Sequence, residues 1–179
     1  PRCSSRSRHR GLKFVYDELL ESISRPVRVL HVAPEPIFYR LFKENELVSY
    51  ETMDYFLDDV DYKEDIQLMS FAAGQYDFVL CNHVLEHVPD DAKALSEISR
   101  ILAHDGRAII TIPGNFKKHK TTYFKHLRYN GHYRDYGLDV ADLMKQHFRK
   151  VEMKDLSKYN KPFVNYGIKE AEIAFICSK

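Results

Sequence analysis

Four polar side chains that could carry chemistry follow an apolar run near the middle of the chain. Residues 78–81 show no alternation of apolar and polar types, and Asn82, His83, Glu86 and His87 come directly after them. An imidazole titrates near neutrality and can act as a general base, position an acceptor or bind a metal. The spacing of His83 and His87 also suits a metal on one helix face, but no third ligand is nearby in sequence. We therefore expect no metal here, with His83 on the acceptor side and His87 in a packing or capping role.

The apolar run is typical of a strand in a parallel sheet. A strand that is apolar on both faces must be covered on both sides, as happens in α/β layer folds. Ligands in these folds bind beyond the carboxyl ends of the strands. The polar residues after position 81 should therefore lie at a ligand-binding edge.

Strand and helix patterns alternate along the rest of the chain. We expect helices over about 12–23, from 36, from about 91 to 105 and near 138–148, and strands over 27–32, 47–53, 108–112, 150–156 and 172–177. This alternation predicts an α/β fold of Rossmann-like type, with three layers, a mostly parallel sheet and an antiparallel C-terminal strand. Residues 115–134 have no clear period, which is usual for a lid or binding loop.

The bulk composition narrows the functional classes. The 179 residues suffice for one substantial core, the formal net charge is +1, and no apolar run approaches the roughly 20 residues of a membrane span. We expect neither nucleic acid nor membrane as a partner, and three cysteines without a signal peptide favour the cytoplasm. The chain begins at Pro1 without a methionine, so we expect it to be trimmed from a longer protein.

The turn after the first predicted strand disfavours a phosphate-bearing cofactor. Residues 33–36 read Ala-Pro-Glu-Pro, which lacks the glycines that let backbone amides approach a pyrophosphate, and the two prolines have no N–H to donate. Glu35 would instead attract a positively charged cofactor without phosphates, such as S-adenosylmethionine. Asp54 follows about 20 residues later, where a carboxylate contacts a ribose. The alternative for Asp54 is that it only caps a turn.

Five ordered motifs strengthen this interpretation. They are residues 29–36 with Asp54, Asp65 with Ile66, residues 76–88, residues 100–106, and residues 131–137. Together they resemble class I S-adenosylmethionine-dependent methyltransferases, and more narrowly the subgroup whose first motif reads leucine-histidine-phenylalanine-alanine-proline-glutamate. The resemblance covers most of the chain from about residue 26. We accordingly divide the chain into a basic segment and helix, 1–25, and a methyltransferase domain, 26–179.

The resemblance implies a role for each matching position. Ala33 and Glu35 would border the methionine end of the cofactor, Asp54 the ribose, and Asp65 with Ile66 the adenine. Asn82 and His83 would lie where the methyl group is transferred. The segment that binds the acceptor would contain His132, Tyr133, Arg134 and Tyr136, with His83 and His132 as candidate bases. The first ten residues resemble the end of a cysteine-rich segment, but Cys3 and His9 alone are too few for zinc, so we expect no metal there.

Two functional classes remain open. The first is a methyltransferase that modifies an O or N atom of a small-molecule or glycan-type acceptor, and the basic residues 117–128 weakly suggest an acceptor with negative charge. The second is a non-catalytic regulatory module of the same fold that binds S-adenosylmethionine or a nucleoside. A nucleic-acid methyltransferase is disfavoured because Asn82 is followed by His83 rather than by an Asn-Pro-Pro-Tyr type tetrapeptide.

Overall fold

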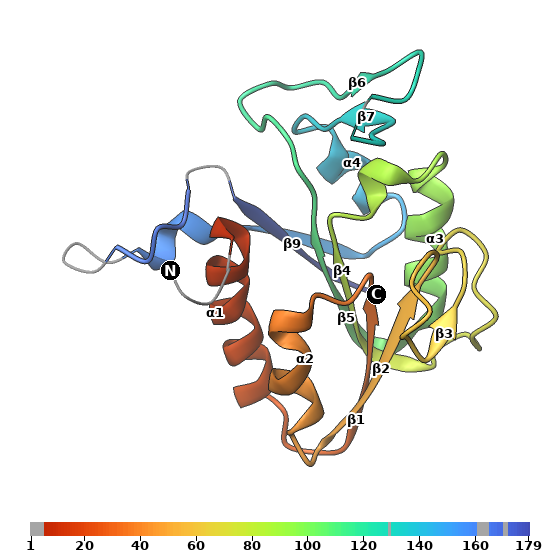
Figure 1. Ribbon diagram of the computed structural model, residues 1–179, viewed down its shortest axis with the longest axis vertical. Helices are drawn as coiled ribbons and strands as arrows, with labels where there is room; N and C mark the ends of the chain where they lie inside the picture. Colours follow the sequence, from red (N-terminus) through yellow and green to blue (C-terminus); the bar gives the residue numbers. More distant parts are fainter. Residues whose placement is uncertain (1–5, 129, 161–164, 170–171) are drawn as a thin grey trace.

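A central sheet of seven strands forms the middle layer of the molecule (Figure 1). The computed structural model describes residues 6–128, 130–160, 165–169 and 172–179. In chain order the strands of this sheet are β1 (Val27–Val32), β2 (Val48–Asp54), β3 (Tyr62–Lys63), β4 (Tyr76–Asn82), β5 (Leu102–Thr111), β8 (Lys150–Asp155) and β9 (Ile173–Ser178). A separate pair is formed by β6 (Thr122–Tyr123) and β7 (Arg134–Asp135).

The strand order of the sheet is β3-β2-β1-β4-β5-β9-β8. All neighbours up to β5 pair in parallel, whereas β9 runs antiparallel to both β5 and β8. The predicted α/β fold, mostly parallel with an antiparallel C-terminal strand, is confirmed. The order reverses direction between β1 and β4, and ligands in open α/β sheets bind at such a point, outside the carboxyl ends of the strands.

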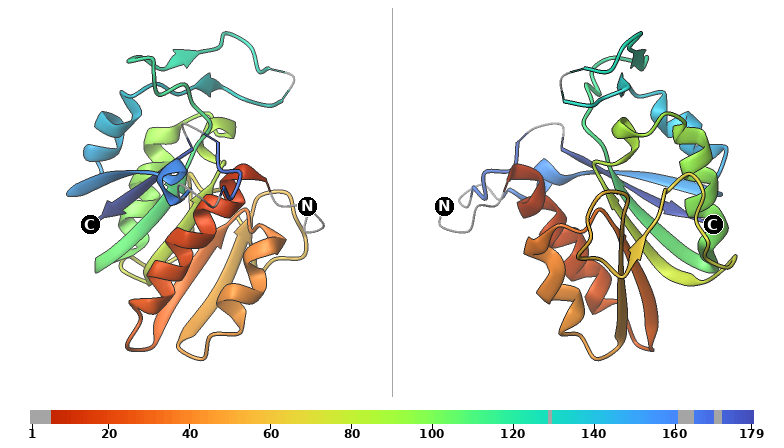
Figure 2. Two further views of the ribbon diagram at one scale, coloured as in Figure 1. Left: turned by 90° about the vertical axis from the view of Figure 1, so that its left-hand side faces the viewer. Right: turned by 45° about the vertical axis from the view of Figure 1, so that its right-hand side comes forward.

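Helices cover both faces of the sheet (Figure 2). On one face lie α1 (Ser7–Glu21) and α2 (Pro36–Lys43), which bury Tyr16 and Phe42 against the sheet. On the other face lie α3 (Asp91–Ile101) and α4 (Val140–Lys145), which bury Ile98 and Met144. Each such side chain contributes about 1.5–3 kcal/mol when fully buried, so both layers hold the sheet in place. Two short 3₁₀ helices, Leu85–His87 and Leu156–Tyr159, complete the fold.

Several elements differ from their expected bounds, among them α1, which begins at Ser7, and β5, which begins at Leu102. The helix predicted to run to residue 105 ends at Ile101, because Leu102 takes extended backbone angles and pairs with Tyr76 at the start of β5. The late helix is also shorter than expected and spans only Val140–Lys145. None of the described helices is both long and apolar enough to cross a bilayer.

Candidate functional site

A cavity of about 580 Å³ lies at the carboxyl ends of β1, β2 and β4. This volume falls within the range of pockets that bind small molecules and cofactors. The residues that the sequence singled out and that line this cavity are Ala33, Asp54, Asp65, Ile66, His83, His87 and Tyr133. They come from five separate segments, which the fold brings together.

Two residues of this cavity have left-handed backbone angles. The φ angle is 52° at Ala33, directly after β1, and 54° at His83, directly after β4. A residue other than glycine rarely adopts such angles, and they occur mainly where surrounding structure imposes them. The N–H of Ala33 donates to the carbonyl of Met53, and that of His83 donates to the carbonyl of Thr111. Both turns are therefore fixed by the neighbouring strand.

Asp54 ends β2 and has two local hydrogen bonds. The backbone N–H groups of Phe56 and Leu57 donate to its Oδ1 over 2.6 and 2.9 Å. The carboxylate therefore stabilises its own turn, as the alternative interpretation required, and it also lines the cavity. Within the part of the chain that the structure describes, both hydrogen bonds use the same oxygen, so turn stabilisation and ligand binding are compatible.

Asp65 and Ile66 form the opposite wall together with Gln67. The Asp65 carboxylate accepts hydrogen bonds from the backbone and side-chain amides of Gln67, while the Gln67 Oε1 accepts one from the N–H of Asp90. Ile66 is buried and presents an apolar surface. This wall therefore combines a held carboxylate with an apolar contact.

Glu35 and Asn82 are not among the residues that line the cavity. The Asn82 Nδ2 donates to Glu35 Oε2 over 3.0 Å and to the Tyr16 hydroxyl over 2.7 Å, and its Oδ1 accepts from Thr111. The Glu35 carboxylate also pairs with Arg8 at 3.1 Å. The polar atoms of these side chains are held by α1 and the sheet, and their contact with the cofactor stays a prediction.

His9 of α1 completes this network in one tautomer. The backbone N–H of Arg6 donates to His9 Nδ1 over 3.2 Å, so the proton of the neutral ring is on Nε2. That Nε2 donates to Glu35 Oε1 over 2.8 Å. Burial lowers the pKa of His9, although the charge of Glu35 opposes this shift. His9, considered at first as a metal ligand, instead ties the N-terminal helix to the turn after β1.

His31 lies beneath this network as a neutral ring. Its side chain is fully buried, its Nδ1 lies 2.8 Å from the Tyr50 hydroxyl, and burial lowers its pKa to about 3. The ring therefore packs here as an uncharged, hydrogen-bonded group.

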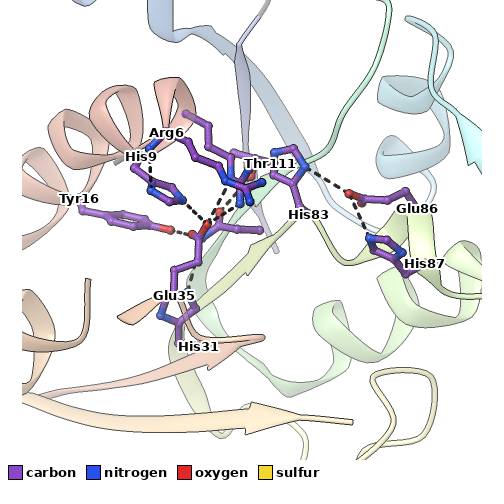
Figure 3. Close-up of polar contacts among 11 residues, drawn as sticks. Arg6, His9, Tyr16, His31, Glu35, His83, Glu86, His87 and Thr111 are labelled. Atoms are coloured by element: carbon purple, nitrogen blue, oxygen red, sulfur yellow. Dashed lines mark hydrogen bonds and ion pairs between the residues drawn. The ribbon is translucent and has the colours of Figure 1, made fainter. Parts of the chain in front are cut away.

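A second polar group is formed by His83, Glu86, His87 and His132. The Glu86 Oε1 lies 3.2 Å from His83 Nδ1 and 3.9 Å from His87 Nε2 (Figure 3). The ring centroids of His87 and His132 are 4.8 Å apart. Burial lowers the pKa of His132, with Glu86 opposing the shift. The structure thus brings both candidate bases, His83 and His132, close to one buried carboxylate.

Arg134 and Tyr136 are buried against the segment after β4. The guanidinium of Arg134 pairs with Asp91 at 2.8 Å and donates to the carbonyls of Leu85, Val88 and Pro89. The hydroxyl of Tyr136 lies 2.8 Å from Asp91 Oδ2. Each residue is only 2% exposed, and both donate to backbone carbonyls of the segment after β4. Their contact with the acceptor stays a prediction.

The sequence reasoning missed two groups of residues near the cavity. Tyr55 and Phe56 line it although their side chains are 57% and 81% exposed, and exposed aromatic side chains beside a carboxylate were a signal that could have identified them. The second group borders a smaller cavity of about 380 Å³, which shares His83 with the first. Its other lining residues are Arg6, Ser7, Arg8, Arg10, Lys169 and Glu172.

The comparison with known families identifies the class of protein. Residues 8–158 match the family described as methyltransferase domain, so this chain belongs to that family. The family-level resemblance drawn from the sequence motifs is thereby confirmed. No curated protein matches the chain in sequence.

Solved structures share the fold at low sequence identity. The 1,6-didemethyltoxoflavin-N1-methyltransferase of Burkholderia thailandensis, solved with 1,6-didemethyltoxoflavin and S-adenosylhomocysteine, has a TM-score of 0.69 and 16% identity, covering 98% of this chain and 78% of that one. The phosphoethanolamine N-methyltransferase 2 of Haemonchus contortus, in complex with S-adenosyl-L-methionine, gives 0.60 and 15%, with 83% and 39% covered. The YcgJ protein of Bacillus subtilis gives 0.58 and 18%, with 82% and 70% covered.

Proposed function

We propose that this chain transfers a methyl group from S-adenosylmethionine to an O or N atom of a small-molecule or glycan-type acceptor. The observation that carries the proposal is the position of Asp54 at the carboxyl end of β2, inside a cavity that also contains Ala33, Ile66 and His83. Membership of the methyltransferase family and the cofactors bound in structures of the same fold support it. The sequence motifs further support the subgroup whose first motif resembles residues 30–35.

Each residue that lines the cavity would contact a particular part of the cofactor. Asp54 would accept hydrogen bonds from the ribose hydroxyls, a charged interaction of about 1.5–3 kcal/mol. Ile66 and the exposed ring of Phe56 would enclose the adenine, with Asp65 at its polar edge. Ala33 would border the methionine end. Glu35 and Asn82 would act from behind this wall by fixing the turn after β1, since their polar atoms are already paired.

The methyl donor supplies an activated methyl group, and the protein must align an acceptor with it. Orientation of this kind corresponds to effective molarities of roughly 10⁵–10⁸ M. Glu86 lies 3.2 Å from His83 Nδ1 and would keep a proton on that nitrogen. His83 Nε2 would then be the nitrogen that accepts a proton from a hydroxyl or ammonium acceptor. His132 is the second candidate base, because it lies close to the same carboxylate.

The smaller cavity suggests where the acceptor binds. It shares His83 with the larger cavity and is lined by four cationic side chains, those of Arg6, Arg8, Arg10 and Lys169. Among the residues that the structure describes, Glu172 is the one anionic side chain of this lining. Arg8 is already paired with Glu35. Arg10 is held by the carbonyls of Tyr166 and Gly167. The cationic character of the lining as a whole favours an acceptor that carries a negative group, and the shared His83 would bring its reactive atom toward the methyl donor.

Calorimetry with S-adenosylmethionine and S-adenosylhomocysteine tests the cofactor assignment. We expect saturable binding to the wild-type chain and a loss of at least tenfold in affinity for Asp54→Asn. Asp105→Asn is the matched control, because Asp105 is exposed, pairs with His104 and does not line the cavity. An absence of heat at millimolar ligand would refute the cofactor, and unchanged affinity in Asp54→Asn would refute the ribose role.

A metabolite screen separates an enzyme from a binding module. Labelled S-adenosylmethionine is incubated with the chain and a fractionated extract, and methyl uptake is compared with that of His83→Asn. Uptake into an anionic fraction that depends on His83 would support catalysis as proposed. Tight cofactor binding without uptake in any fraction would instead favour the regulatory module.

A further inference from the structure

Three side chains with metal-binding atoms converge beside the larger cavity. One carboxylate oxygen of Glu86 and one ring nitrogen each of His87 and His132 lie within 4.8 Å of one another. Glu86 and His87 belong to the 3₁₀ helix after β4, whereas His132 comes from the segment before β7. The backbone N–H of Tyr133 donates to the carbonyl of Glu86 over 2.8 Å, and this bond holds the two segments together.

The carboxylate of Glu86 is buried without a full set of partners. Its side chain is 1% exposed, and its Oε2 has no hydrogen-bond partner among the described residues. A buried carboxylate oxygen that is not hydrogen-bonded costs free energy, so such a group in a native structure requires an explanation. A cation bound to this oxygen would remove the cost.

His87 is oriented as metal-binding histidines usually are. Its Nδ1 donates to the carbonyl of Gly131 over 3.2 Å, which leaves the lone pair of the neutral ring on Nε2, the nitrogen that faces Glu86. A histidine that binds a metal commonly donates its other N–H to a backbone carbonyl in this way. Gly131 has a φ of 75°, and a Cβ there would lie 3.4 Å from His87 Nδ1. The close approach of this carbonyl thus relies on a glycine.

We propose that Glu86, His87 and His132 bind one divalent transition-metal ion at the acceptor side of the cavity. The sequence predicted no metal because no third ligand stands near His83 and His87, and His132 supplies that ligand from 45 positions beyond His87. Two imidazoles and one carboxylate match zinc and non-haem iron(II) sites that keep open positions for a water or a substrate.

The triad needs a small contraction to enclose an ion. Nitrogen and oxygen ligands lie about 2.0–2.2 Å from zinc, so they are about 3.3–3.6 Å apart in a tetrahedral shell. The present separations of up to 4.8 Å therefore have to shorten by about 1 Å. His87 and His132 are both partly exposed, so their rings can rotate toward the fixed, buried Glu86.

At this position the ion could bind the acceptor as well as stabilise the structure. His87, Tyr133 and His83 all line the larger cavity or its border with the smaller one. An oxygen or nitrogen of the acceptor could occupy an open position of the metal, which would lower the pKa of that group and fix its distance from the methyl donor. This role rests on the proposed methyl transfer, whereas the binding of the ion does not.

Titration of the chelator-stripped, tag-free chain with Co²⁺ and Zn²⁺ tests the site in the absence of any methyl donor. We expect one ion per chain, a visible Co²⁺ spectrum of a four- or five-coordinate site, and displacement of Co²⁺ by Zn²⁺. Glu86→Gln and His132→Ala should each weaken binding at least tenfold. His104→Ala is the matched control, because this exposed histidine pairs only with Asp105 among the described residues, and it should stay within twofold of wild type.

The outcomes are separable from those of the cofactor test. No saturable binding at 1 mM ion, or equal weakening in His104→Ala, would overturn the metal site. If Glu86→Gln loses its native circular dichroism, His132→Ala alone decides the matter, since its side chain is on the partly exposed rim. Calorimetry with S-adenosylmethionine in the presence of chelator reports on the methyl donor independently, so a chain that binds the donor but no ion overturns only this proposal.

Discussion

Ala33 and His83 end two adjacent parallel strands with the same left-handed backbone turn, at φ angles of 52° and 54°. Each turn directs the following residues away from the sheet, and both residues line the larger cavity. Non-glycine residues in this region cost about 1–3 kcal/mol each, so unfavourable backbone energy is concentrated where a ligand would bind.

Replacing Ala33 with glycine should stabilise the fold. Glycine adopts positive φ angles without steric cost, and we expect Ala33→Gly to raise the free energy of unfolding by about 1 kcal/mol. Urea unfolding followed by circular dichroism measures the change. Ala73→Gly provides the control, since Ala73 is exposed and has a negative φ angle, and it should lower stability instead. A lower midpoint for Ala33→Gly would contradict the strain assigned to this turn.

The proposed role of His83 as a base can be separated from its structural role in the left-handed turn after β4. Asparagine tolerates left-handed angles and can still donate to Glu86, so His83→Asn should fold and keep its affinity for S-adenosylmethionine. With an acceptor identified by the metabolite screen, we expect kcat to fall about 10²–10⁴-fold. His126→Asn, on an exposed part of the loop, should keep wild-type kcat. A loss confined to KM would assign His83 to positioning the acceptor.

Tyr136 should matter for stability and not for ligand binding. Tyr136→Phe removes the hydroxyl that lies 2.8 Å from Asp91 Oδ2, and the loss of a partner for this buried carboxylate should cost about 1–3 kcal/mol. Thermal and urea unfolding measure this loss, while calorimetry should give an unchanged affinity for S-adenosylmethionine. The exposed Tyr123→Phe should be near neutral in both experiments. A weaker affinity for S-adenosylmethionine in Tyr136→Phe would contradict a role confined to stability.

His31 should make the fold sensitive to mild acid. Its pKa is about 3 in the folded chain and about 6.5 when unfolded, so the unfolded state binds the extra proton first. The stabilisation is fully present above pH 6.5 and is lost as the pH falls from about 6.5 toward 3. Between pH 7.5 and 5.5 this loss is about 1.4 kcal/mol. Over this pH range the free energy of unfolding of His31→Asn, which cannot titrate at this position, should fall by about 1.4 kcal/mol less than that of the wild-type chain. Urea unfolding at each pH measures both values, and an equal pH dependence in the two proteins would refute the assignment.

Local patterns were sufficient to predict six of the seven strands of the sheet, all but the two-residue β3, and much of the cavity. Apolar runs identified the strands, and the residues directly after them, such as Ala33, Asp54 and His83, follow from the rule that parallel strands place their carboxyl ends at one edge. Ile66, which the family resemblance singled out, also lines the cavity. These positions depend on short stretches of sequence, so no knowledge of distant contacts was needed.

The missed contacts join segments that are far apart in the chain. Glu35 carries a charge that seemed meant for a ligand, but it pairs with Arg8 and His9 of α1. Arg134 seemed to belong to an exposed binding loop, but it donates to backbone carbonyls around position 88. Which partner neutralises a charge depends on tertiary packing, and a single sequence does not reveal it.

The insertion of β9 between β5 and β8 has a consequence for the order in which the chain folds. In the described part of the sheet β8 pairs only with β9, so it has no partner until residues 173–178 are available. During synthesis on a ribosome, β1 to β5 can pair as they emerge, whereas β8 has to wait for the last strand to be released. We expect the nascent chain to expose the unpaired edge of β5 until β9 pairs with it. Chaperones would therefore act on the chain before β9 is in place.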